Sequence, residues 1–343
     1  MAVTNNALLT NSYDFSLPEE LIATYPASPR DSAKLLVYDR KNDTITHALF
    51  RDIESFIPKE AALIFNNTKV IKARLYGKKS SGGKVELLIN RPLNAHDISV
   101  YIRGRVKEKT LLEFDTDLRA RVMQLKEDGS RIVRFFQNEK ELRFEELLPV
   151  LDGIGHIPLP PYLQREDEEL DEQEYQSVFA KKEGAVAAPT ASLHFTTELY
   201  EHITAAHPFA EVTLHVGSGT FKPVETEIIT DHPMHSEYYE IPAQAKELLD
   251  SDVPILAVGT TSTRTIEYYA RTRQPSGEAN LFLHPGNPPQ RVNHLLTNFH
   301  LPKSTLIMLV ASFVGLEKTL ELYETAIEHR YRFYSYGDAM LIL

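Results

Sequence analysis

The 343-residue chain has 42% hydrophobic and 25% charged residues, values ordinary for a globular protein, so its composition excludes a disordered or a fibrous chain. It contains no cysteine, which excludes disulfides, thiol nucleophiles and thiolate metal sites and is compatible with a reducing compartment. The formal net charge of −11 argues against a nucleic-acid partner, but net charge averages over the surface and hides local basic regions.

Positive charge is concentrated in one segment of the chain. Residues 69–134 hold 16 Lys and Arg against 8 Asp and Glu, so this segment carries a net charge of +8 and the remainder −19. Because a chain of this length usually exceeds one hydrophobic core, we expect two structural units. The basic segment is a candidate RNA-contact surface, although a solvated, lysine-rich face explains it equally well.

The N-terminal region begins with elements of a buried sheet. Ser16, which precedes Leu-Pro-Glu-Glu, predicts a short helix within Phe15–Ile22, because serine caps a helix and acids suit its first turn. Apolar runs at Leu35–Asp39 and Ala61–Phe65 predict buried strands. No signal peptide precedes them, and no apolar stretch reaches the roughly 18 residues of a membrane span. We therefore expect a cytoplasmic protein without a membrane partner.

The basic segment contains short β-rich pieces about ten residues apart. Turns at Ser81–Gly83 and Glu127–Gly129 separate some of them, and this spacing is typical of a small antiparallel β-barrel or sandwich, of which we favour the barrel. The proline-rich stretch Gly153–Pro161 is expected to lead back to the main body. We therefore predict an inserted basic β-barrel domain, 69–152, within a discontinuous catalytic domain, 1–68 and 153–343.

The second half of the chain alternates between strand and helix patterns. Seven acids within Glu166–Glu174 come first, and we interpret this run as a solvated loop or helix end. Strands are then predicted at 211–216 and 254–258, and helices at 198–204, 243–249, 262–271, 306–313 and 316–329. Such alternation predicts an α/β main domain with a mixed sheet.

Chemistry is expected in this half, because nine of the thirteen histidines lie between His194 and His300. A histidine beside apolar residues is more often structural than catalytic, so the surrounding motif has to decide. Within Ala188–Thr196, the Pro-Thr pair predicts a turn or helix start. Thr190 and the exposed amides there can hold an anion, and His194 lies one turn further along.

A second motif, His215–Phe221, follows a predicted strand. Gly217 and Gly219 let the backbone approach a ligand closely, although a tight turn explains the two glycines as well. The third glycine and the spacing of the dinucleotide fingerprint are missing, so we predict no nicotinamide site.

Two further motifs join a strand to a helix. The stretch Ala257–Glu267 offers backbone N–H groups, Thr260 and Arg264 to an anion, but it lacks the pattern of a P-loop. The other motif contains Asn298 and His300 immediately before a predicted helix.

Histidines and a carboxylate also gather at Asp231–Glu237. Three of these side chains, His232, His235 and Glu237, suit a metal ion by type, but neither the zincin spacing nor a thiolate supports one. We therefore expect no metal.

Taken together, these motifs resemble one family. The likeness extends from Tyr13–Phe15 through Phe65–Val70 and Pro158–Tyr162 to Tyr331–Met340, so it covers nearly the whole chain. In order and length the motifs are similar to those of the bacterial queuosine-pathway family of S-adenosylmethionine:tRNA ribosyltransferase-isomerases. Ser192, where that family usually has glycine, is a departure that weakens the case for close backbone approach there.

The resemblance implies that S-adenosylmethionine is a co-substrate whose ribosyl part, not its methyl group, is transferred. The acceptor is the aminomethyl group of a 7-deazaguanine base in tRNA, and the products are epoxyqueuosine-tRNA, adenine and methionine. The acceptor amine, with an ordinary pKa near ~10, must lose its proton to attack, and so must the ribose carbon beside the sulfonium. A base is therefore needed twice. We expect the protein to act as a monomer.

Site residues follow from the motifs and the resemblance. The candidate bases are three histidines and two carboxylates: His194, His215, His300, Asp338 and Glu237. Substrate contacts are expected from Thr190, Gly217, Gly219, Thr260, Arg264, Asn298, Tyr334 and Tyr336. Among these, Arg264 suits a carboxylate or phosphate and the tyrosines suit the sulfonium, with a structural role as the alternative for each. The residues expected to contact tRNA are Arg74, Arg103, Arg105 and Lys107.

Two other functions remain open from the sequence alone. An S-adenosylmethionine-dependent RNA methyltransferase would share the co-substrate and leave S-adenosylhomocysteine, but no glycine-rich methyltransferase loop follows an early strand. A non-catalytic RNA-binding protein would need only the basic segment, and the polar motifs of the second half argue against it.

Overall fold

The structure is a computed structural model, and it describes residues 5–217, 219 and 223–343. The chain forms two compact units. The larger comprises Met1–Thr68, Gln176–Lys182 and Ala188–Leu343, and the smaller comprises Lys69–Tyr175 and Glu183–Ala187. The strands β4 (Thr68–Val70) and β12 (Lys182–Ala185) pair where the chain passes from one unit to the other.

The larger unit is built on a mixed nine-stranded sheet, as predicted, with the order β16-β14-β13-β3-β15-β17-β18-β1-β2. Four neighbours, β13, β3, β15 and β17, are parallel, whereas β18 runs antiparallel to β17 and parallel to β1. The strand bounds are β1 Lys34–Asp39, β2 Thr44–Leu49, β3 Ala62–Asn66, β13 Phe209–Leu214, β14 Glu237–Glu240, β15 Ile255–Val258, β16 Ser276–Ala279, β17 His294–Asn298 and β18 Ala339–Ile342.

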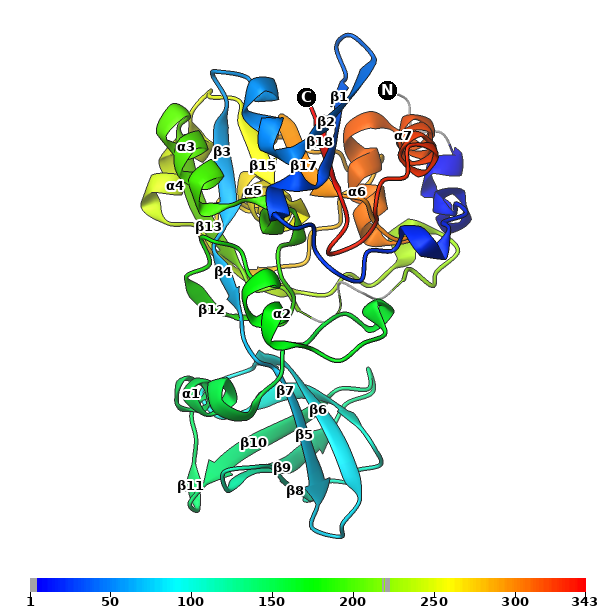
Figure 1. Ribbon diagram of the computed structural model, residues 1–343. Helices are drawn as coiled ribbons and strands as arrows, with labels where there is room; N and C mark the ends of the chain where they lie inside the picture. Colours follow the sequence, from blue (N-terminus) through cyan, green and yellow to red (C-terminus); the bar gives the residue numbers. More distant parts are fainter. Residues whose placement is uncertain (1–4, 218, 220–222) are drawn as a thin grey trace. The chain divides into compact units, whose positions relative to one another are not determined.

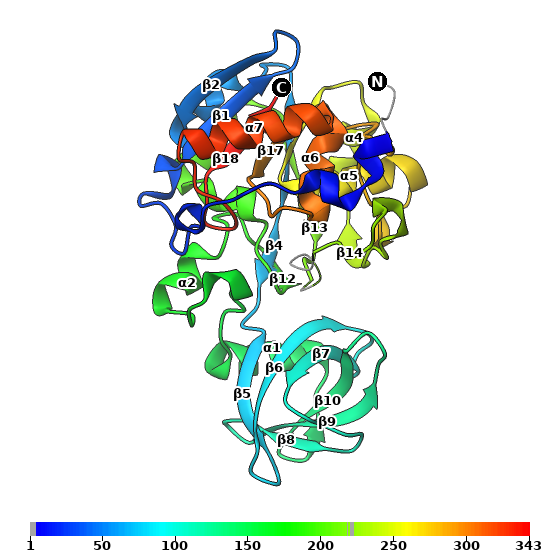
Figure 2. The same cartoon turned by 90° about the vertical axis from the view of Figure 1, so that its right-hand side faces the viewer.

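Helices cover this sheet (Figure 1). They are α3 (Thr197–Ala206), α4 (Ala243–Asp250), α5 (Thr260–Thr272), α6 (Thr305–Val314) and α7 (Leu316–Glu328). The helix α5 packs across β3, β13, β15 and β17, whereas α6 and α7 pack on each other, with the N-terminal turn Thr10–Tyr13 against α7 (Figure 2). Almost every residue of α6 is buried, which accounts for its nearly continuous apolar sequence.

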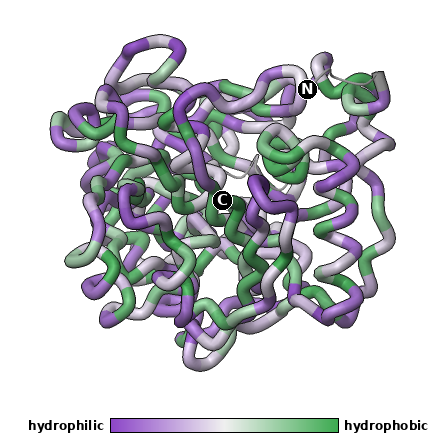
Figure 3. Tube along the Cα trace, turned by 90° about the horizontal axis from the view of Figure 1, so that it is seen from above, coloured by the Kyte–Doolittle hydropathy of each residue, from purple (hydrophilic) through white to green (hydrophobic). Residues whose placement is uncertain are grey.

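The apolar residues of the strands are buried, as expected for a packed core, and Figure 3 shows hydrophobic and hydrophilic segments alternating along the trace. The predicted helix within Phe15–Ile22 is wrong, since only a 3₁₀ turn forms at Glu19–Leu21. Beyond it the chain is extended, because Ile22 bridges to Phe333. Within the described part of the chain, no helix is both long enough and apolar enough to span a membrane.

The smaller unit is a closed antiparallel β-barrel, as predicted. Its ring runs β10-β7-β6-β5-β8-β9, and β9 pairs back onto β10; the short strand β11 extends β10 in a hairpin. Alternate residues of β9 (Leu118, Ala120 and Val122) point into the core. The strand bounds are β5 Arg74–Lys79, β6 Lys84–Pro92, β7 Ile98–Arg103, β8 Leu111–Glu113, β9 Leu118–Leu125, β10 Arg131–Gln137 and β11 Lys140–Glu141.

The expected end of the inserted domain at residue 152 falls too early. Helix α1 (Phe144–Ile154) packs Leu147 and Leu151 into the barrel core, and backbone hydrogen bonds between Arg74 and His156 keep the following stretch with the barrel. The acidic run forms α2 (Glu169–Glu174) rather than a wholly solvated segment, because buried Asp171 makes two hydrogen bonds with Arg165, of 2.6 and 2.7 Å.

Candidate functional site

Four parallel strands of the larger unit end along one edge of the sheet. They are β3, β13, β15 and β17. Three of the four motifs predicted in the second half of the chain begin at these ends: His215–Phe221, Ala257–Glu267 and the motif with Asn298 and His300. The antiparallel strand β18 starts at the same edge, since Ala339 is paired with Asn298, so the stretch just before it also arrives there. Ligand sites of α/β sheets form beyond such carboxyl ends. Most of the predicted site residues therefore lie along this edge.

A side-chain amide joins three elements at the edge. Asn66, the last residue of β3, donates to the carbonyl of Leu214 at 3.0 Å and to Thr261 Oγ1 at 3.1 Å. Its Oδ1 accepts the backbone N–H groups of Leu214, at 3.0 Å, and of Thr68, at 3.2 Å. The sequence did not single out Asn66 as a site residue, although polar Asn-Asn-Thr directly after a buried strand was a usable signal.

The first group at the edge is centred on buried Glu237. Its carboxylate binds the Arg264 guanidinium and accepts the backbone N–H of Gly217 at 2.9 Å, and His235 Nε2 lies 3.4 Å away. Burial alone would raise the pKa of Glu237, but the Arg264 and His235 charges outweigh it and lower the pKa to about 2. A Cβ added at Gly219 would lie 2.9 Å from the His235 ring, so a larger residue there would force the imidazole to shift.

Arg264 is committed to this group. Besides Glu237, its Nε donates to the carbonyl of Leu281 at 3.2 Å and its Nη2 to that of Ala279 at 3.5 Å. The sequence predicted Arg264 as the partner of a ligand anion, whereas the structure gives its charge to a protein carboxylate. Its role is therefore to hold Glu237, and the anion contact falls away.

The second group surrounds His215. Its Nδ1 is 2.7 Å from Thr68 Oγ1, and its ring stacks on Tyr238 with centroids 6.0 Å apart. Burial, with a smaller effect from the Lys182 charge, lowers the pKa of His215 to about 4, and Glu240 opposes this. The imidazole is therefore neutral at physiological pH.

The third group contains His194, at the end of the 3₁₀ turn Thr190–His194. Burial, reinforced by the Arg332 charge, lowers its pKa to about 3. Its ring lies 4.9 Å from that of Phe50. Asn298 lies close enough to raise the pKa of His194 slightly, while its Nδ2 donates to the carbonyl of Tyr334 at 3.0 Å. The structure thus brings the first and fourth motifs together.

Other predicted residues border this group. Thr190 begins the 3₁₀ turn and Thr260 begins α5, directly after Gly259, whose φ of +91° favours glycine. Tyr334 and Tyr336 are buried, and burial raises the pKa of Tyr334 to about 12, so its hydroxyl stays protonated. This burial does not favour the predicted contact of either ring with the sulfonium.

Two predicted bases are held by the protein itself. His300 Nε2 lies 2.7 Å from Thr297 Oγ1, and burial lowers its pKa to about 3. Asp338 accepts the backbone N–H groups of Arg332, at 2.7 Å, and Lys34, at 3.0 Å, and pairs with the Arg332 guanidinium at 3.2 Å. Both arrangements are typical of groups that fix local structure.

The predicted tRNA contacts on the barrel differ in accessibility. Arg103 is 89% exposed, and Arg105 and Lys107 are exposed on the loop after β7. Arg74 differs, because its guanidinium donates to the carbonyl of Leu159 at 3.0 Å and lies 3.2 Å from Glu86. Intramolecular partners thus occupy Arg74, and the prediction of an RNA contact there is not favoured.

The arrangement of the side chains bears on whether the chain binds a metal ion. Across residues 5–217, 219 and 223–343, no three His, Asp or Glu side chains converge as a metal-binding group. The near neighbours His235 and Glu237 are accompanied by the positive charge of Arg264, which disfavours a cation.

The chain is similar to known proteins over nearly its whole length. A sequence model of the family described as queuosine biosynthesis protein matches residues 10–342. The chain belongs to this family. Among its members, a protein from Sulfurimonas denitrificans is 68% identical over 342 residues, which are 99% of this chain and 100% of that protein, and one from Nitratiruptor is 62% identical over 98% and 99% of the two chains. Both are named S-adenosylmethionine:tRNA ribosyltransferase-isomerase.

A solved structure supports the same fold. The crystal structure of S-adenosylmethionine tRNA ribosyltransferase from Thermotoga maritima is 34% identical in sequence, with a TM-score of 0.53. The match covers 97% of this chain and 100% of the other. The fold of this chain is therefore similar to that of a solved S-adenosylmethionine tRNA ribosyltransferase.

Proposed function

We propose that the chain is an S-adenosylmethionine:tRNA ribosyltransferase-isomerase. It transfers and isomerises the ribosyl part of S-adenosylmethionine onto the aminomethyl-deazaguanine base of tRNA, and it releases adenine and methionine. The observation that carries this proposal is the full-length identity of 57–68% to relatives that bear this name. The gathering of the family motifs at the carboxyl edge of the four parallel strands supports it.

Proton transfer in this reaction needs a group that can accept a proton near neutral pH. The low pKa values of His194 and His300, about 3, and of His215, about 4, make these imidazoles weak bases. We assign His194 and His215 to hydrogen bonding with the substrates, as neutral groups, whereas His300 keeps its structural contact with Thr297. His235 is different in its position, because its side chain is 27% exposed and its Nε2 lies 3.4 Å from the buried carboxylate of Glu237.

We therefore place the proton acceptor at His235, which the sequence suggested only as a poor metal ligand. Glu237 is its positioning residue, and Arg264 keeps Glu237 charged in a buried setting. Gly217 and Gly219 belong to the same group, since one donates to Glu237 and the other leaves room for the imidazole. Asn298, Thr190 and Thr260 remain proposed substrate contacts beside His194.

Identification of products tests the function. Incubation with labelled S-adenosylmethionine and tRNA bearing the aminomethyl-deazaguanine base should yield adenine, methionine and epoxyqueuosine-tRNA. S-adenosylhomocysteine as the product would replace this proposal with an RNA methyltransferase. RNA binding without turnover would leave a non-catalytic RNA-binding protein. The cytoplasmic location and monomeric state expected from the sequence stay predictions, and gel filtration with light scattering checks the second.

A further inference from the structure

Three neighbouring strands of the barrel, β5, β6 and β7, carry polar and aromatic side chains on their outer wall. The strand register pairs Lys78 with Lys84, and it pairs Tyr76 with Glu86, which is paired in turn with Arg103. Alternate residues of a strand share a face, so these five side chains lie on the same wall while the residues between them fill the barrel core.

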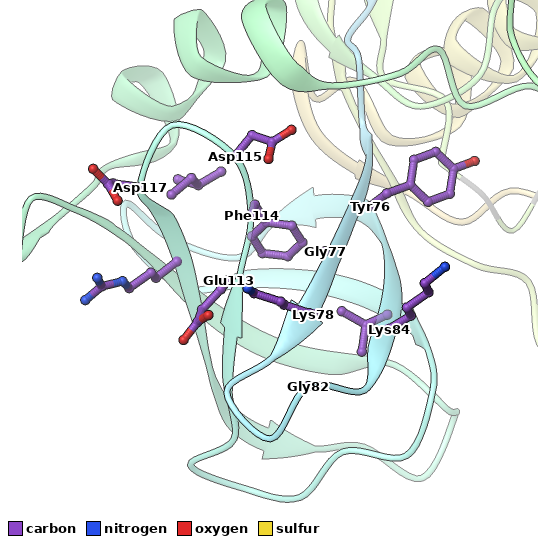
Figure 4. A pocket seen from close by; sticks show the side chains of 12 residues that line it. Tyr76, Gly77, Lys78, Gly82, Lys84, Glu113, Phe114, Asp115 and Asp117 are labelled. Atoms are coloured by element: carbon purple, nitrogen blue, oxygen red, sulfur yellow. The ribbon is translucent and has the colours of Figure 1, made fainter.

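The aromatic ring on this wall is open to solvent. Tyr76 is 45% exposed, and it meets the ring of His156 edge to face with centroids 5.0 Å apart, which supports one side of the phenol. Figure 4 shows Tyr76 and Lys84 extending to the same side of β5, whereas Glu113, Asp115 and Asp117 lie on its other side. Tyr76 thus extends to the same side as Lys84, with Glu86 as its cross-strand neighbour, while the three acids border the far side of the same depression.

The charge of the wall is positive. Its one carboxylate, on Glu86, lies 3.2 Å from the partly buried Arg74 and 3.8 Å from Arg103, so it is neutralised locally. Lys84 is exposed and Arg103 is 89% exposed, which leaves two cations available to a partner. Lys78 contributes less positive charge to the wall, because its paired residue on β8 is Glu113.

We infer that this wall is an RNA-contact surface, on which an unpaired nucleobase stacks on Tyr76 while Lys84 and Arg103 bind the flanking phosphates. The inference rests on the proposed function, which makes tRNA the substrate. Stacking on an exposed aromatic ring, combined with cations along the backbone, is the usual mode of binding to unpaired RNA. The base that stacks on Tyr76 belongs to an RNA loop, because bases within a duplex are already stacked.

The opposite wall of the barrel offers a matched control. In the ring order, β9 lies three strands from β6, and it carries the exposed cation Arg121, which does not border the depression beside Tyr76. The Arg121 guanidinium lies over the Phe136 ring, 5.3 Å from its centroid, so a protein cation already occupies that ring.

The test uses the full chain and a fluorescently labelled anticodon stem–loop RNA, with affinity measured by anisotropy over a range of KCl concentrations. Tyr76→Ala should weaken binding on the order of 10-fold, and Tyr76→Phe should restore it, because the ring and not the hydroxyl stacks. Lys84→Glu and Arg103→Glu should each reduce the salt slope by roughly one. Arg121→Glu, on the opposite wall, should have a much smaller effect.

The inference is overturned if Arg121→Glu weakens binding as much as Lys84→Glu, or if Tyr76→Ala binds like the wild type. Adenine release by the wild-type protein is measured in parallel. If the wild type turns over S-adenosylmethionine but none of the wall variants changes the affinity for RNA, this surface is rejected and the proposed function stands. Absence of turnover would reject the proposed function, while the comparison of the two walls by anisotropy would still decide where RNA binds.

Discussion

The carboxylate of Glu237 accepts the backbone N–H of Gly217 at 2.9 Å. The same carboxylate binds the buried guanidinium of Arg264, so one acid connects a strand, a glycine-containing loop and a helix at the carboxyl edge of the sheet. His235 lies against this acid. A change at Glu237 should therefore affect both folding stability and the chemistry assigned to His235.

Removal of the acid should be costly. Glu237→Ala leaves the Arg264 charge buried without its partner, so we expect a loss of about 3–5 kcal/mol in the free energy of unfolding, measured with urea. Glu240→Ala is the matched control on the same strand. Its pair with Lys182, at 2.7 Å, is part-exposed, so the loss should stay below about 1 kcal/mol. Equal losses would show that the buried pair contributes no more to the free energy of unfolding than the part-exposed pair.

The Glu237 carboxylate should also make stability depend on pH. Its pKa is about 2 in the folded chain and rises to an ordinary value of 4.5 on unfolding. Because the folded pKa is depressed, the stabilisation is complete above pH 4.5 and is lost as the pH falls towards 2. The stability difference between the wild type and Glu237→Gln should therefore shrink over this interval in urea titrations. A constant difference would contradict the charge assignment.

Buried neutral histidines should make the folding stability depend on pH in a second, higher pH range. The pKa of His300 is about 3 when folded and near 6.5 when unfolded, so the unfolded chain binds more protons between these values. Stability should therefore fall as the pH drops below 6.5, by up to about 1.4 kcal/mol per pH unit. His300→Gln should flatten this slope in urea unfolding at pH 5 to 7.5. His202→Gln, which changes a 70% exposed side chain, is the control.

His235→Gln should separate chemistry from folding. We expect kcat for adenine release to fall by roughly 10²–10⁴, since a positioned base contributes that much, while the urea midpoint stays near that of the wild type. His232→Gln, three residues earlier and beside Phe282, should retain activity. A His235→Gln enzyme with the wild-type kcat and pH profile would return the role of base to another residue.

The glycine beside His235 gives an independent test. In Gly219→Ala the new Cβ would lie 2.9 Å from the imidazole, so the ring must move and kcat should fall while the secondary structure, measured by circular dichroism, is retained. Gly153→Ala is the control, because nothing lies within 4 Å of its Cβ position and alanine favours the helix α1. Equal activity of the two variants would argue against a fixed position for His235.

Several residues of the site were predictable and others were not. Asn298 and His194 belong to motifs that are visible in the sequence, and the structure brings them together through β17 and the turn at Thr190–His194. Arg264 was expected to bind a ligand anion, but its partner, Glu237, lies 27 positions earlier in the chain. Pairings of this kind depend on strand order, which hydrophobic patterns do not specify.

Family membership, the α/β class and the inserted antiparallel barrel were determined by the sequence itself, because ordered motifs and hydrophobic periodicity are local properties of the chain. The tertiary structure decided which charges are free. In the folded chain Arg74 contacts the Leu159 carbonyl and Glu86, whereas Arg103 stays exposed. It also moved the proposed base from the buried histidines to His235. Burial and pairing set the charge state of a side chain, and both arise only when distant segments pack together.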